Sequence, residues 1–157
     1  KFKLYSSDCG ILLSQYPVGA AMRVSAGTGD ANFGAVYENV VAQELLSAGF
    51  PLRYYHHSRK GEIVFLVETA DGSVLPIEVK SGKDYKLHTA LNNLLGTNEY
   101  GIGRAYVLSE HNVSRGERKG KPVHYLPLYM TMCLGAERGE ASLADTSPEV
   151  VGFEDLL

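Results

Sequence analysis

The sequence lacks the features that mark membrane, secreted or ATP-hydrolysing proteins. No apolar run approaches the ~20 residues of a membrane-spanning helix. The sequence also lacks the basic start, apolar segment and cleavage site of a secretion signal. No phosphate-binding loop ending in Gly-Lys-Ser/Thr occurs, so we do not expect ATP hydrolysis in these 157 residues. The two cysteines, Cys9 and Cys133, are too far apart to indicate a disulfide framework or a zinc site. We interpret them as buried or half-buried thiols of a cytoplasmic protein.

The composition fits one globular domain, because 45% of the residues are hydrophobic and 21% are charged. The net charge of -3 gives no general attraction to nucleic acid, but the charges are unevenly placed. Residues 136–157 carry six acids against one base, and we interpret them as an acidic tail behind a domain of residues 1–135. The segment SRGERKGK at 114–121 holds four bases against one acid. It predicts a basic loop, either solvated or touching phosphates.

The hydrophobic patterns predict a mixed α/β domain. Helices are expected at 8–16 with Asp8 as the cap, at 33–50, at 84–101 with Asp84 as the cap, and in the apolar stretch that follows a short strand within 122–135. Strands are expected at 1–6, 52–58, 62–69, 74–81 and 104–110, and residues 18–32 are expected to form mainly a loop. The Asp-Gly turn at 71–72 makes the middle pair antiparallel, and Pro76 favours an edge strand or a bulge. The core, from about 32 to 110, is a mixed central sheet flanked by helices.

Glu78 and Lys80 form the clearest candidate site. They share one face of their strand, because strand side chains alternate. A carboxylate there could bind Mg²⁺, and an ammonium beside it could orient an attacking water or stabilise a phosphoryl transition state. The alternative is an ion pair on an exposed sheet face. A second metal ligand would be needed on the neighbouring strand, and Val64 occupies that place if it lies beside Glu78.

Glu38 is the third candidate residue. It lies in a mainly apolar helix, so its carboxylate is either at the edge of the buried stripe or directed at a site.

The stretches GAVYENVVAQELLSAGF, YYHHSRKGEIVFLVE and LPIEVKSGKDYK together resemble the C-terminal domain of unknown function 4143, which follows an AAA-type ATPase module in many prokaryotic proteins. The resemblance implies a restriction-endonuclease-like αβββαβ core of the PD-(D/E)XK type. It also implies that Glu38 is the helix acid, and that Glu78 and Lys80 are the Glu-x-Lys pair of the catalytic strand. The family's Glu-(Val/Ile)-Asp-Phe pattern falls on residues 62–65, where Val64 replaces the aspartate.

The missing aspartate leaves three hypotheses. The first is a catalytically degenerate nuclease-fold domain that recognises nucleic acid or a partner for an upstream ATPase domain. The second is an active Mg²⁺-dependent nuclease that uses Glu38, Glu78 and Lys80. The third is a protein-interaction or oligomerisation module. Mg²⁺ or Mn²⁺ is expected to bind weakly if at all, through Glu38 and Glu78 with Glu62 as a candidate substitute, because affinity follows the number of charged ligands.

Overall fold

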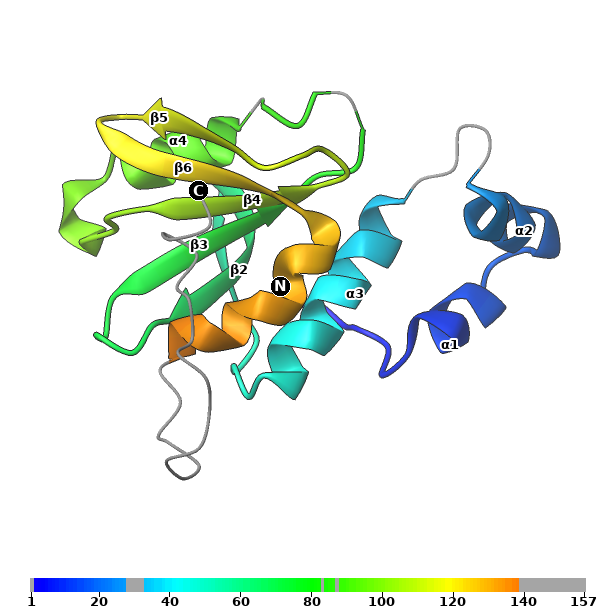
Figure 1. Cartoon of the computed structure of the whole chain (residues 1–157). Helices are drawn as coiled ribbons and strands as arrows, with labels where there is room; N and C mark the ends of the chain where they lie inside the picture. The colour runs from blue at the N-terminus through cyan, green and yellow to red at the C-terminus, as the bar shows by residue number, and fades with distance from the viewer. Residues whose placement is uncertain (1, 28–32, 83, 87, 139–157) are drawn as a thin grey trace.

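The computed structural model describes residues 2–27, 33–82, 84–86 and 88–138. They form a six-stranded mixed sheet with helices on both faces, which confirms the predicted fold class (Figure 1). The strands are β1 (Arg53–His57), β2 (Gly61–Glu68), β3 (Val74–Val79), β4 (Ala105–Ser109), β5 (Ser114–Arg118) and β6 (Lys121–Pro127). The helices are α1 (Cys9–Ser14), α2 (Val18–Ala26), α3 (Gly34–Ser47) and α4 (Thr89–Leu95), with 3-10 segments η1 (Asn98–Tyr100) and η2 (Leu128–Arg138).

The strands lie in the order β1-β2-β3-β4-β6-β5. The pairs β1–β2, β2–β3 and β5–β6 are antiparallel, whereas β3–β4 and β4–β6 are parallel. The element order α3-β1-β2-β3-α4-β4 is the predicted succession of helix, three strands, helix and strand. Because β3 and β4 are parallel, their carboxyl ends meet at one edge of the sheet, where α/β proteins commonly place their sites.

Two apolar layers hold the helices against the sheet. On one face α3 and η2 lie side by side, and the buried side chains there come mainly from α3, β2, β3 and β4 (Figure 1). On the other face α4 covers β2, β4 and β6. The buried side chains of these layers include Val41, Leu45, Phe65, Ile77 and Leu108 on the α3 face, and Ile63, Leu91, Leu95, Val107 and Val123 on the α4 face. Burial of this apolar surface is the main stabilising term of the fold, at roughly 25 cal/mol per Å².

The N-terminal quarter differs from the prediction in two places. Residues 2–6 form no strand, and residues 18–26 form a helix instead of a loop. The α2 helix begins after Pro17 and ends at Gly27, whose φ of 63° is readily adopted only by glycine. Residues 18–26 are rich in Gly, Ala and Ser, a composition typical of loops, although in the structure they form a helix with no buried residue. Asp8 caps α1 as predicted, because its carboxylate accepts from the backbone N–H groups of residues 10 and 11.

Three further expectations are corrected in the second half. The α4 helix begins at Thr89 after His88, so Asp84 is not its cap. The basic segment is an edge strand: β5 pairs with β6 through a tight turn at Lys119 and Gly120, both with positive φ. Pro76 lies in an interior strand, but the β3–β4 ladder starts only at Ile77, so its missing N–H interrupts no hydrogen bond to β4.

The remaining expectations concern the two cysteines and the acidic tail. Cys133 is exposed rather than buried, and Cys9 is half-buried. The acidic residues beyond 138 lie outside the described part of the chain. Within the described ranges no helix combines the length and apolar character needed to cross a membrane.

Candidate functional site

The candidate site lies at the edge of the sheet where β3 and β4 end. Lys80 follows β3 directly, and its backbone N–H donates to the carbonyl of Leu108 at 2.8 Å, which fixes the two strand ends together. The α3 helix is tied to the same edge, because the Tyr37 hydroxyl donates to the carboxylate of Glu110, just after β4. Residues far apart in the sequence are therefore held around one edge.

Glu78 and Lys80 form an ion pair, with 2.9 Å between Lys80 Nζ and Glu78 Oε1. Glu78 is only 6% exposed, so the pair does not lie on an exposed sheet face. Its Oε2 atom has no hydrogen-bond partner among the described residues. Burial is the main cause that raises the pKa of Glu78 above its ordinary value, and the charge of Glu38 adds to the rise. The charge and hydrogen bond of Lys80, and the charge of Lys3, lower this pKa but do not outweigh the burial. The charges of Lys80, Glu38 and Lys3 therefore all influence the pKa of Glu78.

Glu38 is held by a lysine that the sequence analysis did not single out. Lys3 Nζ lies 3.1 Å from Glu38 Oε2 and 2.7 Å from Glu62 Oε1. Burial lowers the pKa of Lys3, but its hydrogen bonds to Glu62 and Glu38 outweigh this and leave the pKa above the ordinary value. The other oxygen of Glu62, Oε2, lies 3.4 Å from His56 Nδ1. Glu38, the predicted helix acid, and Glu62, the candidate substitute ligand, therefore share the ammonium group of Lys3.

Strand β2 contains an irregularity at the position of the missing aspartate. Its pairing with β1 steps from Arg53 opposite Leu66 to Tyr55 opposite Ile63, so β2 carries one extra residue between these points. This is a β-bulge, and it breaks the alternation of side chains along the strand.

The Val64 side chain is part of the apolar layer. The β2–β3 ladder runs up to Phe65 opposite Ile77, so the next residues along these strands are Val64 and Glu78. Val64 is 7% exposed and belongs to the same buried cluster as Phe65, instead of alternating with it. It also lines a mainly apolar cavity of about 200 Å³ together with Phe2 and Tyr5. At the place where the family pattern has an aspartate, this protein has apolar packing.

The acids present do not fit a divalent metal ion. The described ranges contain no group of three or more His, Cys, Asp or Glu side chains that could hold one. Glu38 and Glu62 are engaged by Lys3, and Glu78 by Lys80. Mg²⁺ and Mn²⁺ prefer several oxygen ligands around one centre. Here two of the carboxylates already share the Lys3 ammonium and the third is paired with Lys80.

Aromatic and basic side chains follow the ends of β3 and β4 along the chain, as Lys80 does. The rings of Tyr85 and His111 are stacked with centroids 3.8 Å apart. Lys86 Nζ lies 5.5 Å from the centre of the Tyr85 ring, within the range of a cation–π contact. We call Lys80, Tyr85, Lys86 and His111 the basic–aromatic edge.

His88 lies beneath this edge and is 3% exposed. Its ring is 5.7 Å from that of Tyr125, and neither ring nitrogen has a hydrogen-bond partner within the described ranges. Burial, together with the nearby charges of Lys80 and Arg118, lowers the pKa of His88 to about 4. The imidazole is therefore neutral at neutral pH.

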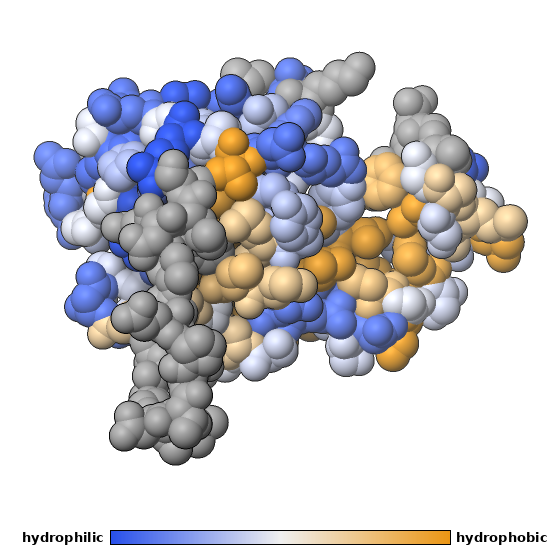
Figure 2. All heavy atoms as spheres, viewed as in Figure 1, coloured by the Kyte–Doolittle hydropathy of each residue, from blue (hydrophilic) through white to orange (hydrophobic). Residues whose placement is uncertain are grey.

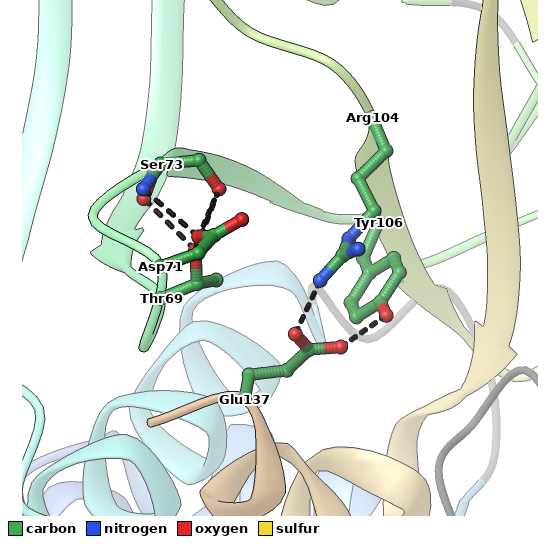
Figure 3. Close-up of polar contacts among 6 residues, drawn as sticks. All are labelled: Thr69, Asp71, Ser73, Arg104, Tyr106 and Glu137. Atoms are coloured by element: carbon green, nitrogen blue, oxygen red, sulfur yellow. Dashed lines mark hydrogen bonds and ion pairs between the residues drawn. The ribbon is translucent and has the colours of Figure 1, made fainter. Parts of the chain in front are cut away.

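A second polar cluster anchors the end of η2 to the sheet (Figure 3). The carboxylate of Glu137 accepts from the Arg104 guanidinium and from the Tyr106 hydroxyl. The Glu137 carbonyl accepts from the backbone N–H of Ala70 at 2.9 Å. In the adjoining turn Asp71 accepts from three donors on two neighbouring residues, which holds its pKa well below the ordinary value. This cluster is structural, since it fixes η2 against the α3 face.

Sequence reasoning found Glu38, Glu78 and Lys80 but missed Lys3, His88 and the Tyr85–His111 stack. The sequence carries no signal for the Lys3 contacts, which span 35 positions to Glu38 and still more to Glu62. Asp-Tyr-Lys at 84–86, close behind Glu-Val-Lys, was a usable hint that a basic and aromatic segment follows the strand.

Comparison with known proteins gives one match. Residues 33–129, more than half of the chain, match the family model described as Domain of unknown function (DUF4143), and the chain belongs to this family. No curated protein and no solved structure matches the chain.

Proposed function

Taking this family membership as the premise, we propose that the chain is a nuclease-fold accessory domain that has lost cleavage and recognises nucleic acid. In this proposal its core is of the restriction-endonuclease-like type, it works in the prokaryotic cytoplasm, and its partner is an AAA-type ATPase module upstream in the same protein. The element order α3-β1-β2-β3-α4-β4 and the Glu78–Lys80 pair at the end of β3 support this assignment.

The observation that carries the proposal is the basic–aromatic edge. Lys86 offers an ammonium group to phosphates, and Lys80, although paired with Glu78, keeps 32% of its side chain exposed. The stacked rings of Tyr85 and His111 offer a platform for an unpaired base. Proteins that bind single strands combine these two features, and stacking contributes about 1–3 kcal/mol per base. The neutral, buried His88 adds no charge of its own beside Lys80.

The loss of cleavage follows from the neighbourhood of Glu78. Val64 supplies no ligand, and the other acids are paired with lysines. A general acid–base or metal-assisted reaction needs a water held between charged groups. We therefore propose that Glu78 and Lys80 now support the edge and that Mg²⁺ or Mn²⁺ binds weakly at most.

The proposal is tested by fluorescence anisotropy with labelled single-stranded and duplex oligonucleotides of DNA and RNA over a range of salt concentrations. Tyr85→Ala should weaken binding of single strands roughly 5- to 100-fold, the equivalent of one lost stack. Lys86→Ala should weaken binding of all sequences alike and lower the salt slope by about 1.

The matched control is Arg53→Ala. Arg53 is exposed, pairs with Glu68 and lies near the Glu68–Val74 end of the sheet, opposite Lys80. Its removal should leave the affinity unchanged beyond a small electrostatic effect. If wild type binds none of the oligonucleotides at low salt, the proposed function is wrong.

A second candidate, a protein-interaction or oligomerisation module, is favoured by the apolar surface around α1, α2 and α3 (Figure 2). Ile11, Val18 and Met22 are exposed on the two short helices, and Tyr129 and Met132 are exposed on η2. Exposed apolar patches of this kind often mark protein interfaces. Sedimentation analysis distinguishes this candidate, because self-association through an apolar face should persist at salt concentrations that abolish nucleic-acid binding.

A further inference from the structure

The N-terminal segment, residues 2–6, is fastened to α3 by a buried side chain. Asn39 is 1% exposed, and its Oδ1 accepts from the backbone N–H of Ser6 at 2.7 Å, while its Nδ2 donates to the Ser6 carbonyl at 3.2 Å. The Tyr5 ring packs against Phe65 with centroids 5.5 Å apart. These contacts fix Tyr5 and Ser6 against β2 and α3, and so they set the position of Lys3 just before them.

At this position the Lys3 ammonium lies between two carboxylates from different elements. It contacts Glu38 on α3 and Glu62 on β2, and its side chain is 18% exposed. Two carboxylates that approach a common point repel each other unless a cation lies between them. The buried Glu78 also senses the Lys3 charge. The single ammonium therefore contacts acids from α3 and β2, and its charge also lowers the pKa of Glu78 on β3.

We propose that Lys3 is an internal cation, which fills the place between Glu38 and Glu62 where a divalent ion would otherwise balance the acids. The cation of this site is a part of the chain and not a metal. The same contact ties residues 2–6 to α3 and to β2. This inference rests on the proposed function only in treating Glu38 and Glu78 as acids of a former nuclease site.

The test is calorimetric titration of Mn²⁺ into wild type and into Lys3→Gln, at matched pH and ionic strength. Lys3→Gln should bind Mn²⁺ at least about tenfold more tightly than wild type, because a positive charge has been removed from between two carboxylates. The thermal midpoint of Lys3→Gln should fall, and Mn²⁺ should restore it where NaCl at equal ionic strength does not. Lys3→Gln/Glu62→Gln removes one charge of each sign and should lose this restoration.

Arg53→Gln serves as the control, because it removes a cation that faces a single exposed acid, and it should gain no Mn²⁺ affinity. Equal Mn²⁺ affinity of wild type and Lys3→Gln would overturn the proposal. So would a Lys3→Gln protein that binds no Mn²⁺, because the acids would then form no cation site.

If Lys3→Gln does not fold alone, its circular dichroism is followed as Mn²⁺ is added. Recovery with Mn²⁺ and not with NaCl supports the internal cation, and no recovery overturns it. Oligonucleotide binding by wild type is measured separately, so failure of the proposed function does not alter the outcome of the Mn²⁺ comparison.

Discussion

Replacing Val64 by aspartate supplies the residue that the resemblance implies for this position, but the structure predicts that it destabilises the protein. Val64 is 7% exposed and packs with Phe65 in the apolar layer. Losing this burial costs about 1.5 kcal/mol. A carboxyl group kept neutral in such a place at pH 7 costs roughly 4 kcal/mol more, since its ordinary pKa is near 4 and each pH unit corresponds to 1.36 kcal/mol.

The sign of the pH dependence follows from the direction of the shift. Burial raises the pKa of the introduced carboxyl in the folded state. Below pH 4 the carboxyl is largely protonated in both the folded and the unfolded protein, so its charge has little effect on the free energy of unfolding. The loss of stability grows as the pH rises, because only the unfolded state then ionises freely. Val64→Asn has nearly the same shape and no charge, which isolates the charge term. For a chain of this size, about 4 kcal/mol corresponds to a fall of roughly 8–16 °C in the thermal midpoint.

Urea denaturation at pH 4 and pH 7 measures both variants. We expect Val64→Asp and Val64→Asn to be similar at pH 4, and the aspartate variant to be the less stable by several kcal/mol at pH 7. Equal stability at pH 7 would refute the reasoning, because the site would then accept a carboxylate as an intact metal pocket does. Lys3 lines the same cavity, so the comparison is repeated in Lys3→Gln, where the penalty should increase.

Two further predictions concern His88 and Glu137, which lie outside the Glu38, Glu62 and Glu78 group. Because the pKa of His88 is lowered from 6.5 to about 4, the unfolded state binds more protons in this window, and stability should fall by up to about 3 kcal/mol between pH 6.5 and pH 4. His88→Gln should flatten that part of the urea-denaturation profile while the exposed-residue control His57→Gln does not; a profile unchanged in His88→Gln would count against the burial argument. Glu137→Ala should cost about 2–3 kcal/mol, because Arg104 and Tyr106 lose a charged acceptor. Glu137→Gln should cost less, since its amide oxygen still accepts, and equal losses in the two variants would contradict this role.

The sequence predicted the fold best where residues are buried with a regular period. The α3 helix and the central strands carry such patterns, and their order was confirmed. The α2 helix was not predicted because residues 18–26 are rich in Gly, Ala and Ser, which is typical of a loop. In the structure the helix begins after Pro17 and ends at Gly27. The β5 strand was missed because it is an edge strand with charged residues, which protect such edges from unwanted pairing.

The candidate site was predicted only in part, for reasons of geometry. Glu78 and Lys80 form an ion pair, and Glu38 lies close enough to raise the pKa of Glu78. The bulge that turns Val64 into the apolar layer breaks the alternation on which strand reasoning depends. The Lys3 ammonium joins Glu38 and Glu62 across long stretches of sequence, and such contacts leave no local pattern.

The most direct test of binding without cleavage measures both on the same labelled oligonucleotides, in the presence of Mg²⁺ or Mn²⁺. We expect wild type to bind the strands and leave them at full length, and Glu78→Ala to leave them at full length as well. Cleavage by wild type that disappears in Glu78→Ala would contradict this expectation, because the Glu78–Lys80 site would then be an active nuclease centre.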